Sequence, residues 1–317
     1  MRRYTPNKVK HNIFKEDTVM ARTSGAKNIQ KFEDRTKVSS TSSKEIKHLA
    51  QSSKSSALDQ FKALLKHQKN YLNWLESRHN ALNDARIELA QLKSENYRGP
   101  KGDTYRKYKW YAEHNALLEA INGFEVFYKT TLINLAKIIR HYVPAEKLSG
   151  AVDVKVLWGL TKASVPELVF EHQLYHDLDN VDKVCFALVG SKRYNKNNPK
   201  SNLRELNLAL QAIFQVRHTL SHNHGVITIS DKSKLKILGY DATTKEVIDP
   251  SKDGLGSSIT RLLEQESKDF TLWLLDKTAD YLKEQVDARG LELDKKIHTR
   301  LQKLLGNNQK LDNLDWV

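Results

Sequence analysis

The stretch NLRELNLALQAIFQVRHTLSHNHG (202–225) decides the fold class, because it predicts a helix with one side buried in a core. Asn202, with Glu205 three residues later, has the form of a capping box, and Gly225 predicts the helix end. At about 100° per residue the apolar side chains share one sector roughly 100° wide, as in a bundle helix. These side chains are Leu203, Leu206, Leu210, Ile213 and Phe214.

Arg217 falls in the middle of that apolar sector. A guanidinium there is costly unless a carboxylate or a phosphate meets it. A second predicted helix, 109–142, carries Glu125 inside its own apolar stripe. We therefore expect Glu125 and Arg217 to meet or to face a shared cleft. Two interpretations stay open: a buried salt bridge that only fixes helix register, or a carboxylate that orients Arg217 to hold a phosphate.

The remaining pattern predicts a mainly α-helical bundle of four or five core helices. Further helices are expected over 165–179 and 258–288, with short strands over 226–230, 234–240 and 245–249. The predicted organisation is a disordered basic arm (1–56), a long helix with a basic and aromatic linker (57–106), a helical bundle with a small β insert at about 226–249 (107–290), and a C-terminal helical tail (291–317). The long helix has a coiled-coil-like stripe, which either pairs with a second copy or folds back on the core.

The net charge of the 317-residue chain is +14, and it is unevenly distributed. Residues 1–55 hold 13 Lys and Arg against 5 Asp and Glu, so the remainder is only mildly basic. The single cysteine, Cys185, excludes a disulfide framework and is typical of a reducing compartment. The sequence has no apolar run of about 18 residues and no apolar segment after its basic start. We therefore expect a soluble, cytoplasmic protein without a membrane partner.

Cations alternate with aromatic rings in the segment YRGPKGDTYRKYKWY (97–111), a combination that suits phosphates and stacked bases. The candidate RNA-binding residues are Arg98, Lys101, Tyr105, Arg106, Lys107 and Lys109, with Arg193 from the basic loop SKRYNKNNPKS (191–201). The opposite interpretation is that the aromatic residues begin the core and the cations are only solvated.

Arg217, His218 and His222 form an R-x4-H pattern at the end of the bundle helix, which resembles the HEPN superfamily. The stretch INGFEVFYKTTLINLAKII (121–139) also looks like the first core helix of several HEPN families. The resemblance covers about residues 109–288. Glu125 upstream and Asn223-His224 downstream are candidate supporting residues. His218 departs from the pattern, because Asn is more usual after the Arg.

The resemblance implies a metal-independent endoribonuclease without a cofactor, in which a homodimer brings two motifs into one composite cleft. His222 would transfer a proton at the ribose 2′-OH or the leaving 5′-oxygen, Arg217 would stabilise the phosphate, and His218 would assist them. The resemblance also implies a toxin or an antiphage defence effector, and a toxin would need an antitoxin or another regulatory protein to control it. His224 stands where some families carry a modified tyrosine, so control by that modification is not expected. The alternative is a non-catalytic HEPN RNA-binding or scaffold protein.

Histidine spacing raises a competing metal hypothesis. His218 and His222 are four residues apart with His224 nearby, and His172 and His176 repeat this spacing. Zinc or copper is disfavoured at the first cluster, because its stretch has no carboxylate or Cys to complete the ligand set and the cation Arg217 lies beside it. For His172 and His176 we expect a surface or helix-end role. The sequence also has no Walker A, G-x-G-x-x-G, G-x-S-x-G or H-E-x-x-H motif. Nucleotide-driven motors, dehydrogenases, serine hydrolases and zinc proteases are therefore disfavoured.

Overall fold

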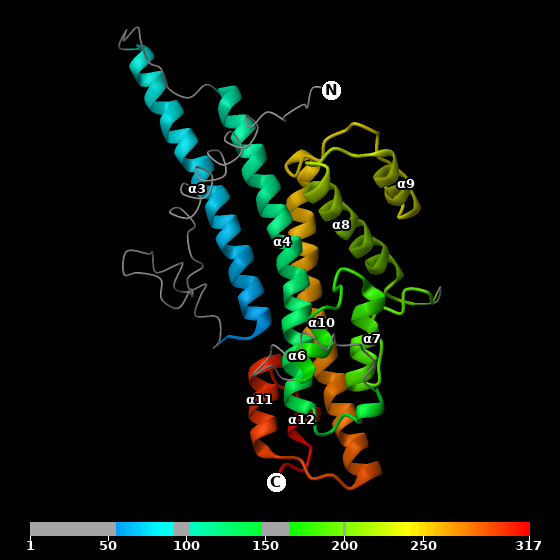
Figure 1. Ribbon diagram of the computed structural model, residues 1–317. Helices are drawn as coiled ribbons and strands as arrows, with labels where there is room; N and C mark the ends of the chain where they lie inside the picture. The colour runs from blue at the N-terminus through cyan, green and yellow to red at the C-terminus, as the bar shows by residue number, and fades with distance from the viewer. Residues whose placement is uncertain (1–54, 92–101, 148–164, 199–200) are drawn as a thin grey trace, which may run out of the picture. The chain divides into compact units, whose positions relative to one another are not determined.

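The computed structural model describes residues 55–91, 102–147, 165–198 and 201–317, which form a mainly α-helical bundle (Figure 1). The prediction of a helical bundle is confirmed. The predicted arm up to residue 54, with Arg98 and Lys101, lies outside the described residues. Within the described ranges, β pairing is limited to two isolated bridges, Val226 with Val247 and Leu293 with Trp316.

The long N-terminal helix is α3 (Ala57–Gln91), which runs antiparallel to α4 (Gly102–Ile139) (Figure 1). Near the start of α3, Phe61 is buried and packs on Phe124 with ring centroids 5.7 Å apart. Farther along α3, Leu82 is exposed. The first half of α3 therefore folds back on the core of its own chain, which was one of the two expected arrangements.

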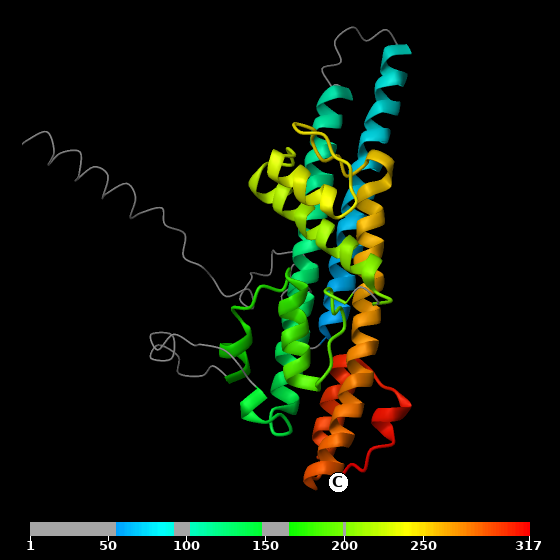
Figure 2. The same cartoon turned by 90° about the vertical axis from the view of Figure 1, so that its right-hand side faces the viewer.

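The central element is α4, against which α3, α6, α7, α8, α10 and α11 all pack. Figure 2 shows α3, α4 and α10 running alongside one another, with α8 crossing them obliquely. After α4 the elements are η3 (Ala145–Lys147), α6 (Val165–Phe170), α7 (Leu178–Val189), α8 (Arg204–His222), α9 (Ile229–Ile237), η4 (Lys252–Gly254), α10 (Leu255–Arg289), α11 (Lys295–Leu305) and α12 (Gln309–Asp312).

The predicted strand over 234–240 is wrong, because most of that stretch lies in helix α9. Thr228 caps α9 by accepting a hydrogen bond from the backbone N–H of Asp231, whose carboxylate in turn accepts from the backbone N–H of Thr228. This capping box starts a helix where the alternating pattern indicated a strand. Only the bridge between Val226 and Val247 remains of the predicted β insert.

The predicted capping box of α8 is also wrong. The helix begins at Arg204 with Leu203 as its N-cap, and no side chain caps it. Asn202 lies one residue outside this cap position, so its amide is too early in the chain to reach the first free backbone N–H groups of the helix.

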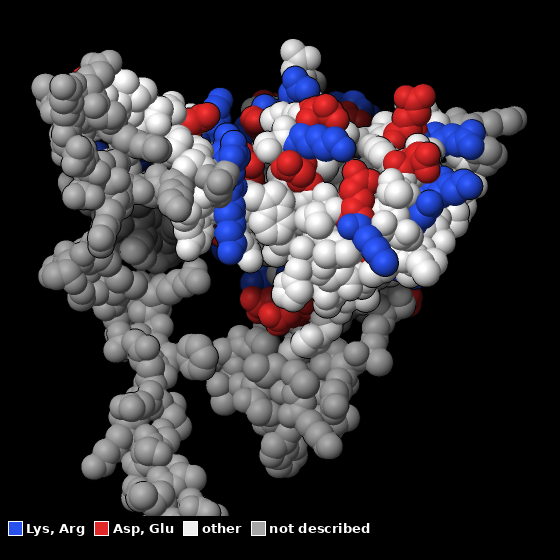
Figure 3. Space-filling model, turned by 90° about the horizontal axis from the view of Figure 1, so that it is seen from above, with Lys and Arg blue, Asp and Glu red and all other residues white. Residues whose placement is uncertain are grey.

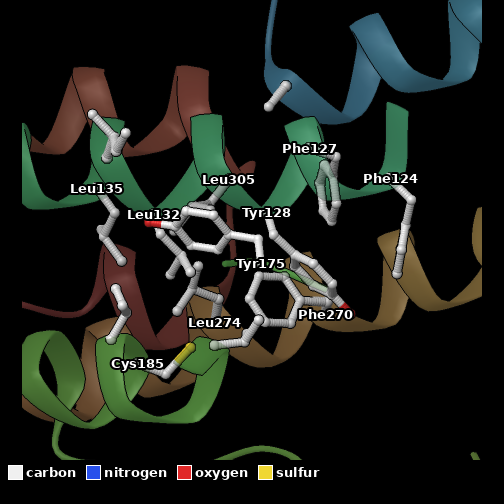
Figure 4. Close-up of a cluster of buried hydrophobic side chains, with 14 of the residues drawn as sticks. Phe124, Phe127, Tyr128, Leu132, Leu135, Tyr175, Cys185, Phe270, Leu274 and Leu305 are labelled. Atoms are coloured by element: carbon white, nitrogen blue, oxygen red, sulfur yellow. The ribbon is translucent and has the colours of Figure 1, made fainter. Parts of the chain in front are cut away.

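The core is built on aromatic side chains of α4 and α10. Tyr128 packs edge-on against Phe270 with centroids 4.8 Å apart, and Phe124 lies 4.5 Å from Tyr128 (Figure 4). Cys185 of α7 lies in the same buried cluster, and burial raises the pKa of its thiol well above the ordinary value. This cluster holds α4, α7 and α10 together and so fixes the side of α4 that faces α8.

Candidate functional site

Arg217 projects from α8 toward α4, as the apolar stripes predicted. Its Nε donates a hydrogen bond to Asn122 Oδ1 at 2.8 Å and lies 3.0 Å from Glu125 Oε1. The Nε–H points at Asn122, so the buried Glu125 Oε1 receives electrostatic attraction from Arg217 but no hydrogen bond. The predicted meeting of Glu125 and Arg217 is confirmed. Asn122 was not predicted from the sequence, although it lies one turn before Glu125 on the same helix.

The pair is partly open to solvent. The side chain of Arg217 is 28% exposed and that of Glu125 is 16% exposed. In the described part of the chain, the terminal nitrogens of Arg217 donate no hydrogen bond to a protein acceptor. The guanidinium is thus held through Nε. Its two terminal nitrogens, which together can bind two oxygens of a phosphate or carboxylate, are available to another acceptor.

His176 forms a trio with these two residues. Its Nδ1 lies 3.4 Å from Glu125 Oε2, and the edge of its ring faces Phe214 at 6.4 Å between centroids. The predicted helix over 165–179 is wrong beyond Phe170, and His176 lies in the turn between α6 and α7. The spacing of His172 and His176 therefore did not indicate the contact with Glu125. A contact between positions 125 and 176 depends on how the turn packs on α4, which a local sequence pattern does not encode.

The trio lines a cavity of about 370 Å³. Asn122 and Lys129 contribute to its wall from α4, and Glu171 contributes from the turn after α6. Lys129 and Glu171 lie 3.7 Å apart, so the two cations of the cavity are balanced by two carboxylates.

His218 and His222 lie outside this cavity. Both are exposed on α8, and their rings are 4.7 Å apart between centroids. The helix geometry explains the separation from Arg217, because positions 217 and 222 are about 140° apart on a helix. Arg217 thus lies in the cavity, whereas His218 and His222 lie on the outer surface of α8.

The two predicted supporting residues after α8 differ in role. Asn223 is the C-cap of α8, and its Nδ2 donates to Asp231 Oδ2 at 3.0 Å, which joins the helix to α9. Burial alone would raise the pKa of Asp231, but hydrogen bonds from Thr228 and Asn223 lower it below its ordinary value. His224 is exposed and has a positive φ of 50°, where the chain turns away from the helix.

In the part of the chain that the structure describes, no three His, Cys, Asp or Glu side chains form a group that could hold a metal ion. The alternative of zinc or copper bound by His218, His222 and His224 therefore lacks its ligand geometry. His176 has its contact with Glu125 rather than with His172.

The predicted RNA-binding segment divides into two sets of residues. Tyr105 stacks on His79 with centroids 3.4 Å apart, and Lys109 lies 3.7 Å from the nearest oxygen of both Glu76 and Glu113. These two residues hold α4 to α3 and to its own next turn.

Arg106 and Lys107 are exposed on α4 and lie beside the exposed rings of Tyr108 and Tyr111 in the sequence. Viewed from above, the surface shows Lys and Arg interspersed with Asp and Glu rather than a patch of positive charge alone (Figure 3).

The predicted RNA contact of Arg193 is not supported by its position. The Arg193 side chain is 9% exposed, and its Nε and Nη2 donate to the two oxygens of Glu266 at 2.8 and 2.9 Å. Tyr194 OH also donates to Glu266 Oε1, at 2.7 Å, and contacts Tyr128 OH. Three backbone N–H groups of residues 193–195 donate to the Asp182 carboxylate. The loop is therefore anchored in the core rather than presented to a ligand.

Comparison with models of protein families, with curated proteins and with solved structures gives no match. Among the helices that the structure describes, none combines the length and apolar character of a membrane span. The resemblance to the HEPN superfamily thus rests on the sequence alone, on the R-x4-H pattern and the stretch 121–139.

Proposed function

We propose that the protein is a metal-independent endoribonuclease of HEPN type that cleaves RNA by attack of the ribose 2′-OH on the adjacent phosphate. One observation carries the proposal: Arg217 is held through Nε by Asn122 and Glu125 at an open cavity, and its terminal nitrogens remain available. Such an arrangement suits two phosphate oxygens, because the guanidinium fork matches their spacing.

In the proposed reaction Arg217 stabilises the negative charge that develops on the phosphate. His222 transfers a proton at the ribose or at the leaving 5′-oxygen, with His218 beside it on the exposed face of α8. The products are a cyclic 2′,3′-phosphate and a free 5′-OH, and DNA is resistant because it has no 2′-OH.

The resemblance also supports a homodimer with a composite cleft, since His218 and His222 are exposed where a second copy has access to them. A cytoplasmic toxin or antiphage effector with a regulatory partner is the corresponding biological role. The homodimer is tested by the oligomeric state, measured by light scattering.

A non-catalytic RNA-binding protein is the second candidate. It is favoured by the exposed aromatic rings Tyr108 and Tyr111 next to the exposed cation Lys107 on α4. Rings and cations on one surface bind single strands without any chemistry.

Incubation of purified protein with RNA in EDTA separates the two candidates. We expect the wild type to cleave RNA. The cleavage rate should fall by about 10²–10³-fold in Arg217→Ala and by about 10²–10⁴-fold in His222→Ala. Arg300→Ala and His141→Ala, both exposed and remote from α8 in the sequence, are matched controls that retain activity. Binding without cleavage favours the second candidate, and equal cleavage by all variants refutes the assignment of Arg217 and His222.

A further inference from the structure

The cavity that holds Arg217 has a histidine of its own, although it is not the histidine of the R-x4-H pattern. His176 lines the same cavity as Arg217, whereas His222 does not. A phosphate bound by the Arg217 fork would therefore lie in a space whose imidazole belongs to His176. The side chain of His176 is 37% exposed, so a substrate in the cavity has access to it.

Glu125 links the two residues through different oxygen atoms. Its Oε1 lies 3.0 Å from Arg217 Nε, and its Oε2 lies 3.4 Å from His176 Nδ1. A carboxylate beside Nδ1 favours the tautomer with the proton on that nitrogen, and Nε2 then carries the free lone pair. Such contacts are often long in the absence of substrate and tighten in the complex.

The surroundings of His176 suit a group that exchanges a proton. The charged groups of the cavity are Glu125 and Lys129 from α4, Glu171 from the turn after α6, and Arg217 from α8. Phe214 of α8 presents an apolar ring to the imidazole. Lys129 and Glu171 pair with each other at 3.7 Å, and Glu125 is the charged group that contacts His176.

We propose that His176 is the general base of this cavity and that Glu125 is the residue that positions it. The inference rests on the proposed ribonuclease function. His176 Nε2 takes the proton of the 2′-OH, O2′ forms a bond to phosphorus, and the bond from phosphorus to O5′ breaks. In the proposed homodimer the leaving O5′ takes its proton from protonated His222 of the second copy, because His222 of the same chain lies outside this cavity. His222 then has the acid role. A proton exchange with water then resets both histidines.

The two roles predict opposite effects on the pH dependence of cleavage. A base acts when it is deprotonated and an acid when it is protonated, so together they give a bell-shaped profile. His176→Asn is expected to lower the rate by about 10²–10⁴-fold and to remove the acid limb of the profile. His222→Asn removes the alkaline limb instead. Glu125→Gln lowers the rate but keeps both limbs, because a positioning residue does not itself take the proton.

The measurement is single-turnover cleavage of an RNA oligonucleotide in EDTA from pH 5 to 9. His172→Asn is the matched control, since His172 is exposed in the same segment between α6 and α7 and does not line the cavity. Binding of a 2′-O-methyl oligonucleotide, which resists cleavage, should be unchanged in His176→Asn. If that variant unfolds, His176→Ala with added imidazole replaces it, and recovery of the rate supports the base role.

Two results overturn the inference, and they are distinguishable. If the wild type cleaves and a folded His176 variant keeps both its rate and its acid limb, His176 is not the base while the proposed function stands. If the wild type cleaves no RNA at any pH, the proposed function fails and the assignment of His176 fails with it.

Discussion

Replacement of Glu266 by Ala tests how the bundle uses its buried charges. The Glu266 side chain is 2% exposed and accepts three hydrogen bonds, two from Arg193 and one from Tyr194. Burial alone would lower the pKa of Arg193, but the hydrogen bonds and charge of Glu266 raise it above its ordinary value. Without the carboxylate, a guanidinium that is nearly enclosed keeps its charge and has no counter-charge.

The expected loss is about 3–5 kcal/mol of the free energy of unfolding, the usual cost of breaking a buried ion pair by removing one partner. With a urea m-value of about 3 kcal/mol/M, this loss lowers the midpoint of unfolding by roughly 1–2 M. The double replacement of Arg193 by Met and Glu266 by Leu should recover most of the loss, because it leaves no unpaired charge.

Urea unfolding followed by tryptophan fluorescence measures these effects, and Glu264→Ala is the matched control on the same helix. Glu264 forms an i, i+4 pair with Lys268 at 2.8 Å, with both side chains about 40% exposed, so its loss should cost only about 0.3–0.5 kcal/mol. Equal midpoints for Glu266→Ala and Glu264→Ala would refute the reasoning. So would an Arg193→Ala variant that keeps its stability but loses RNA affinity, since this would return Arg193 to an RNA-contacting role.

Three further predictions concern other buried groups. Burial lowers the pKa of His114 below 6.5, so at low pH the unfolded chain binds a proton that the folded chain disfavours. The midpoint of thermal unfolding should therefore fall as pH is lowered from 7.5 to 5, and it should fall less in His114→Gln. Asp182→Ala removes the acceptor of three backbone N–H groups and should cost about 2–4 kcal/mol, with faster tryptic cleavage in residues 192–196 as the readout. Cys185 is fully buried and its thiol pKa is raised, so a thiol reagent should modify it only at the rate of unfolding; rapid labelling of the folded protein would contradict this packing.

Local periodicity explains which elements were predictable from sequence. The apolar stripes of α4 and α8 place Glu125 and Arg217 on the buried faces of their helices, and the two side chains meet. The alternation in KLKILGY (234–240) indicated a strand, but a short stretch of alternating residues also fits a surface helix with few buried positions. The capping box of Thr228 and Asp231 decided between them.

The sequence by itself determined the helical class, the two helices that carry the Arg217–Glu125 pair, and the uneven distribution of charge. The tertiary structure alone decided that His176 joins this pair and that Arg193 is buried against Glu266. The physical reason is the range of the interactions. Helical periodicity acts over a few residues, whereas these contacts join turns and helices that are distant along the chain, and only the packed core brings them within reach.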